Sequence, residues 1–225
     1  MKARTSRLAP LVGLLALAAG LSACRPAKTP VVVAPVVLDP PTSKADAWKQ
    51  VAEDADEDRI ATLATVWTQA LEEARKSNAR AVRAENVLLQ PDAALPRPAP
   101  TPGSYYCRLV KLGRTRARGP ALETFKPFYC YVDVEGDLLT IVKQTGDTRP
   151  AGRLWEDNEL NRLIFLGSLA RASEKPRAYG EDPKRDMAGV LERIAPFRWR
   201  LVVPTPQGTS KLEVYELRPT EKQRE

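Results

Sequence analysis

The sequence predicts an α+β fold, with an N-terminal helical segment packed on a C-terminal antiparallel β-barrel. Apolar residues recur at three- and four-residue steps from Asp46 to Arg83, which is typical of an amphipathic helix. From Ser104 onward, short apolar runs separated by turn residues predict about seven or eight strands. Sequential strands with short turns favour an up-and-down meander, and closure into a barrel would remove its exposed edges. A β-sandwich gives a similar pattern and is the alternative.

The chain divides into six predicted segments. Pro-rich stretches separate them, because such composition favours extended chain over packed structure. The segments are a signal peptide (1–23), a lipidated cysteine with a Pro-rich tether (24–44), a helical segment (45–95), a Pro-rich linker (96–103), the β domain (104–219) and a disordered tail (220–225).

The N-terminal segment has the charged, apolar and small-residue order of a secretory signal. Basic residues precede an apolar stretch at 8–19, which is shorter than the ~20 residues that span a bilayer. Leu21-Ser22-Ala23-Cys24 then resembles the lipobox of bacterial lipoproteins at every position. The resemblance implies that Cys24 is lipidated, and Arg25 after it implies the periplasmic face of the outer membrane. An ordinary cleaved signal or a retained membrane helix is the alternative.

Within the helical segment, the acidic cluster at 53–58 predicts the end of a short helix and the start of a longer one. A further short helix is expected over Ala81 to Leu89, ending before Pro91. Among the strands, the clearest alternation sets Phe197, Trp199, Leu201 and Val203 against Arg198 and Arg200. This pattern predicts a strand with one buried face and one solvated face.

Two cysteines remain after Cys24, namely Cys107 and Cys130, each in a strand-like run. Disulfides persist in exported proteins, and neighbouring strands can bring two Cα atoms within bridging distance. We therefore expect a structural disulfide between them; a redox or metal role, or unpaired thiols, are the alternatives.

Composition excludes several functions. The chain has no histidine, so it can build no Ser-His-Asp triad, Cys-His dyad or His-ligated metal site. Removal of residues 1–23 lowers the formal net charge from +7 to +4, which does not indicate nucleic-acid binding. A cluster of basic residues comprises Lys111, Arg114, Arg116 and Arg118. It is either a solvated turn or a surface that contacts an acidic envelope polymer or a lipid headgroup. No cofactor, metal ligand or catalytic residue is predicted.

The segment from Tyr179 to Glu192 is the best candidate binding region, because polar side chains crowd into a glycine-bearing loop between strands. Internal salt bridges would explain the same residues. The candidates are Tyr179, Glu181, Arg185, Asp186 and Glu192. Aromatic residues around the two cysteines form either cross-strand pairs or the lining of a pocket at an open barrel mouth.

Ordered motifs extend over nearly all of the mature chain, from Trp48 to Pro219. Together they resemble the bacterial family of uncharacterised lipoproteins catalogued as domain of unknown function 4893. The family has no established activity, so the resemblance transfers no catalytic residue. The polar turn at 143–150 departs from the family pattern. The motifs are Leu88–Leu95, Gly103–Arg108 with Lys111–Gly113, Phe165–Gly167, Tyr179–Gly180, Arg185–Gly189 and Arg198–Leu201.

We expect a non-catalytic binding or structural module in the cell envelope. It would be attached to the membrane by its N-terminal lipid and would contact an envelope protein or cell-wall polymer. A periplasmic enzyme inhibitor and a carboxylate-dependent cell-wall hydrolase are the alternatives. The hydrolase would need two carboxyl groups about 5 to 9 Å apart.

Overall fold

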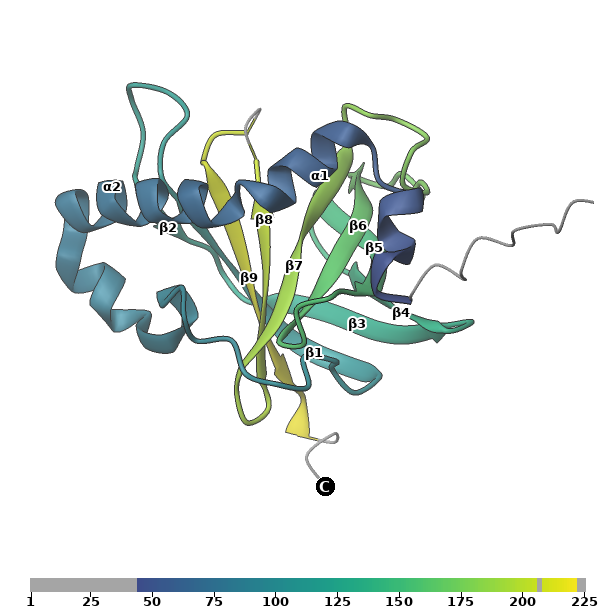
Figure 1. The fold of residues 1–225 in the computed structure, drawn as a ribbon. Helices are drawn as coiled ribbons and strands as arrows, with labels where there is room; N and C mark the ends of the chain where they lie inside the picture. The colour runs from purple at the N-terminus through teal and green to yellow at the C-terminus, as the bar shows by residue number, and fades with distance from the viewer. Residues whose placement is uncertain (1–43, 206–207, 222–225) are drawn as a thin grey trace, which may run out of the picture. The chain divides into compact units, whose positions relative to one another are not determined.

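A computed structural model describes residues 44–205 and 208–221. The signal segment, Cys24 and the rest of the tether up to residue 43 lie outside the described residues, as do residues 222–225 of the expected tail, whereas Lys44 begins the first helix. Among the described residues, the helices are too short or too polar to cross a membrane. In the sequence, the helices come before all the strands (Figure 1). The helical layer comprises η1 (Lys44–Gln50), α1 (Asp54–Ala61), α2 (Leu63–Ala84) and η2 (Asn86–Leu89).

The strands form a nine-stranded antiparallel sheet in the order β2-β1-β3-β4-β5-β6-β7-β8-β9. Because β1 also pairs with β9, eight strands close into the predicted barrel, and β2 extends the end of β1 outside it. Closure decides against the sandwich. The strands are β1 (Gly103–Leu112), β2 (Leu122–Thr124), β3 (Phe128–Glu135), β4 (Leu138–Lys143), β5 (Thr148–Glu156), β6 (Arg162–Arg171), β7 (Asp186–Ala195), β8 (Arg198–Pro204) and β9 (Leu212–Pro219).

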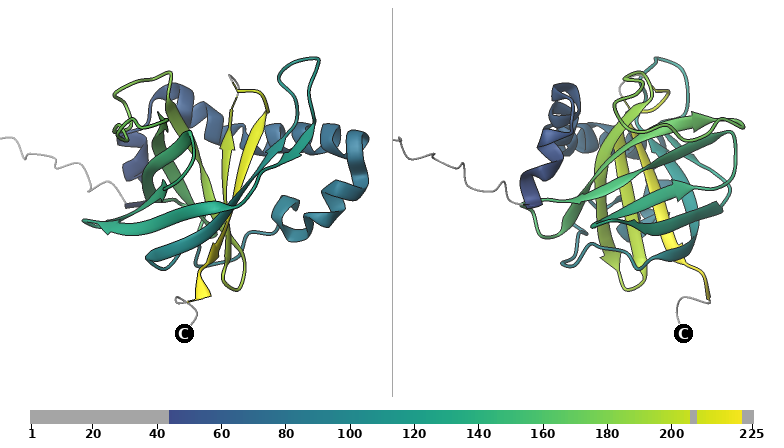
Figure 2. Two further views of the ribbon diagram at one scale, coloured as in Figure 1. Left: turned by 180° about the vertical axis from the view of Figure 1, so that it is seen from behind. Right: turned by 90° about the vertical axis from the view of Figure 1, so that its right-hand side faces the viewer.

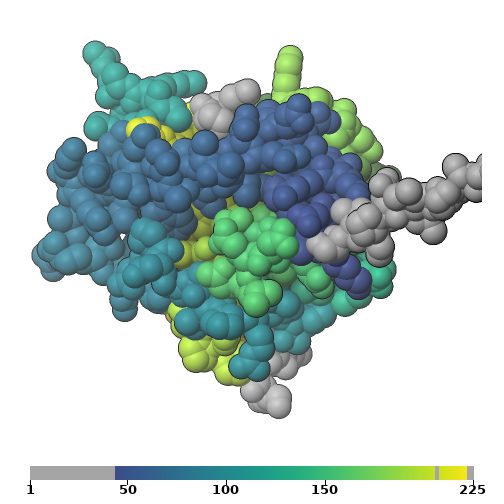
Figure 3. All heavy atoms as spheres, viewed as in Figure 1, coloured from purple at the N-terminus to yellow at the C-terminus, as the bar shows by residue number. Residues whose placement is uncertain are grey.

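The helices lie on one side of the barrel, as the view from the side shows (Figure 2). They form a continuous band across that face in the space-filling view (Figure 3). Gly113 permits this close approach, because a Cβ there would lie 2.9 Å from Ala70 of α2. We call the outer face of β6–β9 and β1 beneath the helices the covered wall, and the outer face of β3–β5 the open wall.

Two apolar cores result. One fills the barrel and includes Tyr105, Phe165 and Leu201, and the other lies between the helices and the covered wall around Trp67. Inside the barrel, Gly152 and Gly167 face each other across β5 and β6, and a Cβ on Gly152 would lie 2.4 Å from the Gly167 Cα. Side chains therefore fill the barrel, as expected for a small closed sheet.

The two-core arrangement corrects the expectation for β8. Trp199 and Leu201 point into the barrel as expected, but Arg200 is also fully buried, beneath the helices. Phe197 does not belong to the buried face, because it lies in the β7–β8 turn and is 56% exposed. The prediction of one solvated face was therefore wrong, since a helical layer covers the outer face as well.

Arg200 is held by ionic, polar and aromatic partners. It donates to Glu192 Oε2 at 2.6 Å, and to the carbonyls of Leu88, Gln90 and Pro91 at 3.0, 2.6 and 3.1 Å. Its guanidinium carbon lies 4.5 Å from the Trp67 ring centroid. Burial lowers the pKa of Arg200, and Glu192 opposes that shift. One buried cation thus fixes the chain after η2 to both the barrel and α2.

The predicted disulfide joins Cys107 of β1 to Cys130 of β3, with a Cα–Cα distance of 5.9 Å. Both cysteines are buried in the barrel. On the outer face of the same strand pair, the Tyr106 and Tyr129 rings lie 5.1 Å apart, as a direct cross-strand pair.

Two local features differ from the sequence-based boundaries. The helix expected over Ala81 to Leu89 is split, because α2 runs to Ala84 with a kink at Asn78 and η2 follows. The segment expected to be a linker lies against the barrel, since Pro98 and Pro100 are buried and Arg193 donates to the Pro96 carbonyl.

Candidate functional site

A pocket of about 270 Å³ lies where the covered wall meets the open wall, between η1, the β6–β7 loop (172–185) and the outer faces of β4–β6. We call it the Tyr179 pocket. Its lining residues are Val51, Glu135, Thr140, Val142, Ala151, Gly152, Arg153, Trp155, Leu166, Arg177, Ala178 and Tyr179. It therefore contains one of the predicted binding residues.

The floor of the pocket is an apolar sheet surface, and Trp155 lies beside it in the lining. Val142, Ala151 and Leu166 come from neighbouring strands and form this surface. The indole N–H of Trp155 is buried and has no hydrogen-bond partner among the described residues. The indole N–H groups of Trp48, Trp67 and Trp199 are likewise buried without a partner, so it is the ring of Trp155, rather than its N–H, that the pocket offers to a bound molecule.

Tyr179 is held in the pocket wall by α1. Its hydroxyl donates to Asp56 Oδ2 at 2.5 Å and accepts from the Glu53 backbone N–H at 3.0 Å. Asp56 is 2% exposed and also accepts from Arg59 at 2.5 Å. Burial, reinforced by the hydrogen bond to Asp56, raises the pKa of Tyr179 well above its usual value. Tyr179 is therefore a neutral, oriented ring at neutral pH.

The charged groups of the lining are already paired. Arg153 donates to both carboxylate oxygens of Glu135, at 2.5 and 3.1 Å, and this contact lowers the pKa of Glu135. Arg177 lies 3.4 Å from Asp182. These pairs are on strongly or partly exposed side chains, so a ligand can displace them at little cost.

Three of the other predicted residues lie in or beside the β6–β7 loop. Arg185 pairs with Glu174 and lies 3.5 Å from Asp182, so it holds the loop together. Asp186 Oδ2 accepts from the Gly180 N–H at 3.1 Å, whereas its Oδ1 is buried and unpartnered. Glu181 is exposed.

Glu192 does not join this group. It lies six residues beyond Asp186 on β7, which corresponds to roughly 20 Å of extended strand. Its carboxylate binds Arg200 instead. Asp186 and Glu192 are therefore too far apart for a glycosidase acid and base pair, and Glu135 is the one carboxylate in the lining described for the Tyr179 pocket.

The aromatic rings near the disulfide do not form a mouth pocket. Tyr105 packs edge-on against Trp199 inside the barrel, whereas Tyr106, Tyr129 and Tyr131 are exposed on the outer wall. A cavity inside the barrel, lined by Phe165 and Tyr215 among others, has a volume of only about 10 Å³. That volume holds at most one water molecule.

The arrangement suits recognition through aromatic, apolar and hydrogen-bonding contacts. Among the described residues, no group of three or more carboxylate or thiol side chains could hold a metal ion. The contribution of Trp155 and Val51 was missed in the sequence, because β5 and η1 meet only through the packing of the helical layer. The apolar character of both residues was visible, but nothing in it indicated a shared pocket.

The sequence model of the family described as "Domain of unknown function (DUF4893)" matches residues 48–217, so the chain belongs to this family. No curated protein and no solved structure matches the chain.

Proposed function

We propose that this member of the DUF4893 family is a lipid-anchored protein of the bacterial cell envelope and a non-catalytic binding module. Cys24 carries the anchor, and the protein faces the periplasm from the outer membrane. The Tyr179 pocket is its binding site, for a segment of an envelope protein or cell-wall polymer. The apolar pocket beside a tyrosine that is held in one orientation carries this proposal.

The pocket has the composition of a recognition site. Apolar and aromatic side chains supply most of its surface, and a few polar groups at defined positions give direction, as in known small-molecule sites. Its volume of about 270 Å³ suits a sugar unit or one to two amino-acid side chains, near the lower end of the usual range.

A photo-crosslinking amino acid at Ala178, in the pocket wall, tests the binding site in intact cells. We expect a reproducible adduct, identified by mass spectrometry as one envelope protein or a glycan fragment. The matched control carries the same crosslinker at Leu160, which is 83% exposed and outside the pocket. The same adducts from both positions would contradict the proposal.

A Trp155→Phe variant then tests the indole, because phenylalanine keeps an aromatic side chain but removes part of the apolar lining. We expect loss of the Ala178 adduct without loss of folding. An undiminished adduct would show that the indole is not part of recognition.

The anchor is tested separately by Cys24→Ser. We expect the variant to lose metabolic palmitate label and to leave the membrane fraction, while retaining the thermal unfolding midpoint of the folded part. Continued fractionation as an integral membrane protein would contradict lipid anchoring.

A further inference from the structure

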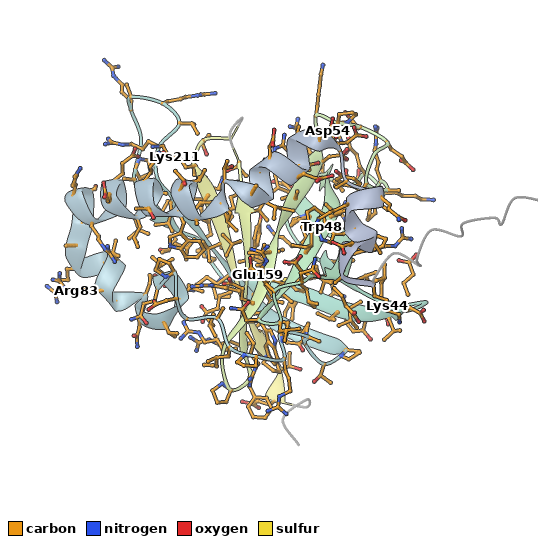
Figure 4. All side chains as sticks on the ribbon, viewed as in Figure 1. Lys44, Trp48, Asp54, Arg83, Glu159 and Lys211 are labelled. Carbon is orange, nitrogen blue, oxygen red and sulfur yellow. A yellow bond between two sulfur atoms is a disulfide. The ribbon has the colours of Figure 1, made fainter. Side chains whose placement is uncertain are left out.

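A second groove lies at the end of the helical layer opposite Asp54, around the labelled Arg83 (Figure 4). Its volume is about 340 Å³. We call it the Arg75–Arg83 groove, and its lining residues are Arg75, Ala79, Val82, Arg83, Asn86, Leu89 and Gln90.

Two irregular backbone positions create this groove. α2 leaves helical geometry at Asn78, where φ is −155° and ψ is 80°. Asn86 has a φ of 51°, in the left-handed region that asparagine tolerates better than most residues. The chain therefore turns back on itself, and Val82 and Leu89, which are 7% and 2% exposed, form an apolar floor between exposed polar side chains.

The two arginines have no carboxylate partner among the described residues, and two of the acidic groups on or next to α2 are already occupied. Glu85 pairs with Arg108 at 2.6 Å, and Glu73 binds Lys211 and the Arg114 backbone N–H. By contrast, Arg162, Arg198 and Arg200 on the barrel are ion-paired. The groove thus carries uncompensated positive charge.

This end of the molecule carries further cations. Arg80 lies on the same part of α2, as does Lys76, which is 4.0 Å from Glu72, and the β1–β2 loop carries Arg116 and Arg118. The bond from the Arg114 N–H to Glu73 holds that loop beside α2. Basic side chains thus lie on α2 next to the groove and on the loop across α2 from it.

We propose that the Arg75–Arg83 groove binds the phosphate of an anionic phospholipid headgroup. Guanidinium groups match phosphate oxygens in a bidentate geometry, and the floor can accept the apolar carbons next to the phosphate. The surrounding cations would face neighbouring anionic headgroups of the same leaflet. This site is separate from the Tyr179 pocket and does not depend on the function proposed for it.

The test uses the full chain and calorimetric titration with dihexanoyl-phosphatidylglycerol below its critical micelle concentration. We expect binding that weakens by at least about tenfold in the Arg75→Gln/Arg83→Gln variant, because two charge-assisted contacts are lost. Arg116→Gln/Arg118→Gln is the matched control, since it removes the same charge outside the groove, and it should change affinity less than about threefold. All four residues are exposed, so unchanged circular dichroism and melting are expected.

Several results would overturn the proposal. Equal weakening in the two variants would show general charge attraction without a groove. Inorganic phosphate binding as tightly as the lipid would assign the site to a free anion, and an acidic peptide binding more tightly would assign it to a protein partner. Equal binding of dihexanoyl-phosphatidylcholine, or no binding of phosphatidylglycerol, would exclude recognition of the anionic headgroup.

Discussion

The covered wall and the open wall of this barrel place polar groups in opposite settings. Beneath the helices, Arg200 and Glu216 are almost wholly buried, and each has several charged or carbonyl partners. On the open wall, Tyr129 and Tyr131 are 45% and 37% exposed, and Glu135 meets Arg153 in solvent. The same strand alternation thus produces a second core on one wall and an accessible surface on the other.

The difference indicates that the two walls of one sheet have different roles, one in stability and the other in contact with other molecules. A buried charge needs its partners to be fixed, which makes the covered wall rigid and intolerant of change. An exposed apolar and aromatic face tolerates substitution and is accessible to other molecules. The Tyr179 pocket lies at the boundary, where α1 orients a tyrosine beside an apolar floor formed by β4, β5 and β6.

The largest expected effect comes from Arg200→Met. The variant leaves Glu192 and three carbonyl groups without their donor in a buried setting, so the free energy of unfolding should fall by about 3 to 5 kcal/mol. Urea denaturation measures this. Arg153→Met on the open wall is the control, because its side chain and that of Glu135 are 49% and 55% exposed, and it should cost less than about 1 kcal/mol. Equal losses would show that the two walls do not differ.

The disulfide connects the two walls, since β1 lies under α2 and β3 belongs to the open wall. Cys107→Ser should lower the free energy of unfolding by about 3 kcal/mol, because the bridge closes a loop with a sequence separation of 23. Thermal unfolding of the variant and of the oxidised and reduced protein provides the measurement. An unchanged midpoint in the variant would contradict a stabilising role.

The barrel and its disulfide could be predicted because both leave local traces in the sequence. The apolar period changes near Ser104, and Cys107 and Cys130 each lie in a strand-like run. The burial of Arg200 left no such trace, because an arginine alternating with apolar residues has the same pattern on a solvated face. Only the packing of the helices on that face decides its environment.

The candidate site, like the fold, could be predicted only where it leaves a local trace in the sequence. The crowding of polar residues drew attention to the β6–β7 loop, and one of the candidate residues there, Tyr179, lines a pocket. The sequence could not show that Glu192 belongs to the Arg200 network or that Trp155 and Tyr179 line the same pocket. Both facts depend on strand register and on where η1 packs.

A smaller effect is expected at the boundary of the two walls. Tyr179→Phe removes the hydroxyl that bonds to Asp56 and to the Glu53 N–H, while Arg59 still pairs with Asp56. The free energy of unfolding should fall by about 1 to 2 kcal/mol. Tyr131→Phe on the open wall is the matched control and should change it by less than about 0.5 kcal/mol. A Tyr179→Phe variant as stable as this control would show that the hydroxyl does not anchor the loop to α1.

The smallest expected effect is on the pH dependence of the free energy of unfolding. It involves two carboxylates whose pKa values are shifted in opposite directions. Burial, with added repulsion from Asp56, Asp182 and Glu53, raises the pKa of Asp186, whereas the Arg185 contact lowers the pKa of Glu174. A raised native pKa means that ionisation of Asp186 weakens folding, so Asp186→Asn should be slightly more stable than the wild type at pH 7. This difference should vanish as the pH falls through the raised pKa towards the ordinary carboxyl value of about 4.

Glu174→Gln should show the reverse sign, because a lowered native pKa stabilises the fold above the ordinary carboxyl pKa and that contribution is lost on acidification. This variant should be slightly less stable than the wild type at pH 7, with a difference that disappears below the native pKa of Glu174. Urea unfolding between pH 3 and pH 7, a range of about four units around the ordinary carboxyl pKa, compares the three proteins. The stability difference between each variant and the wild type should therefore change with pH in opposite directions. If both differences change in the same direction, burial at the start of β7 does not govern the ionisation of Asp186. The boundary of the covered wall would then be as solvated as the loop beside it.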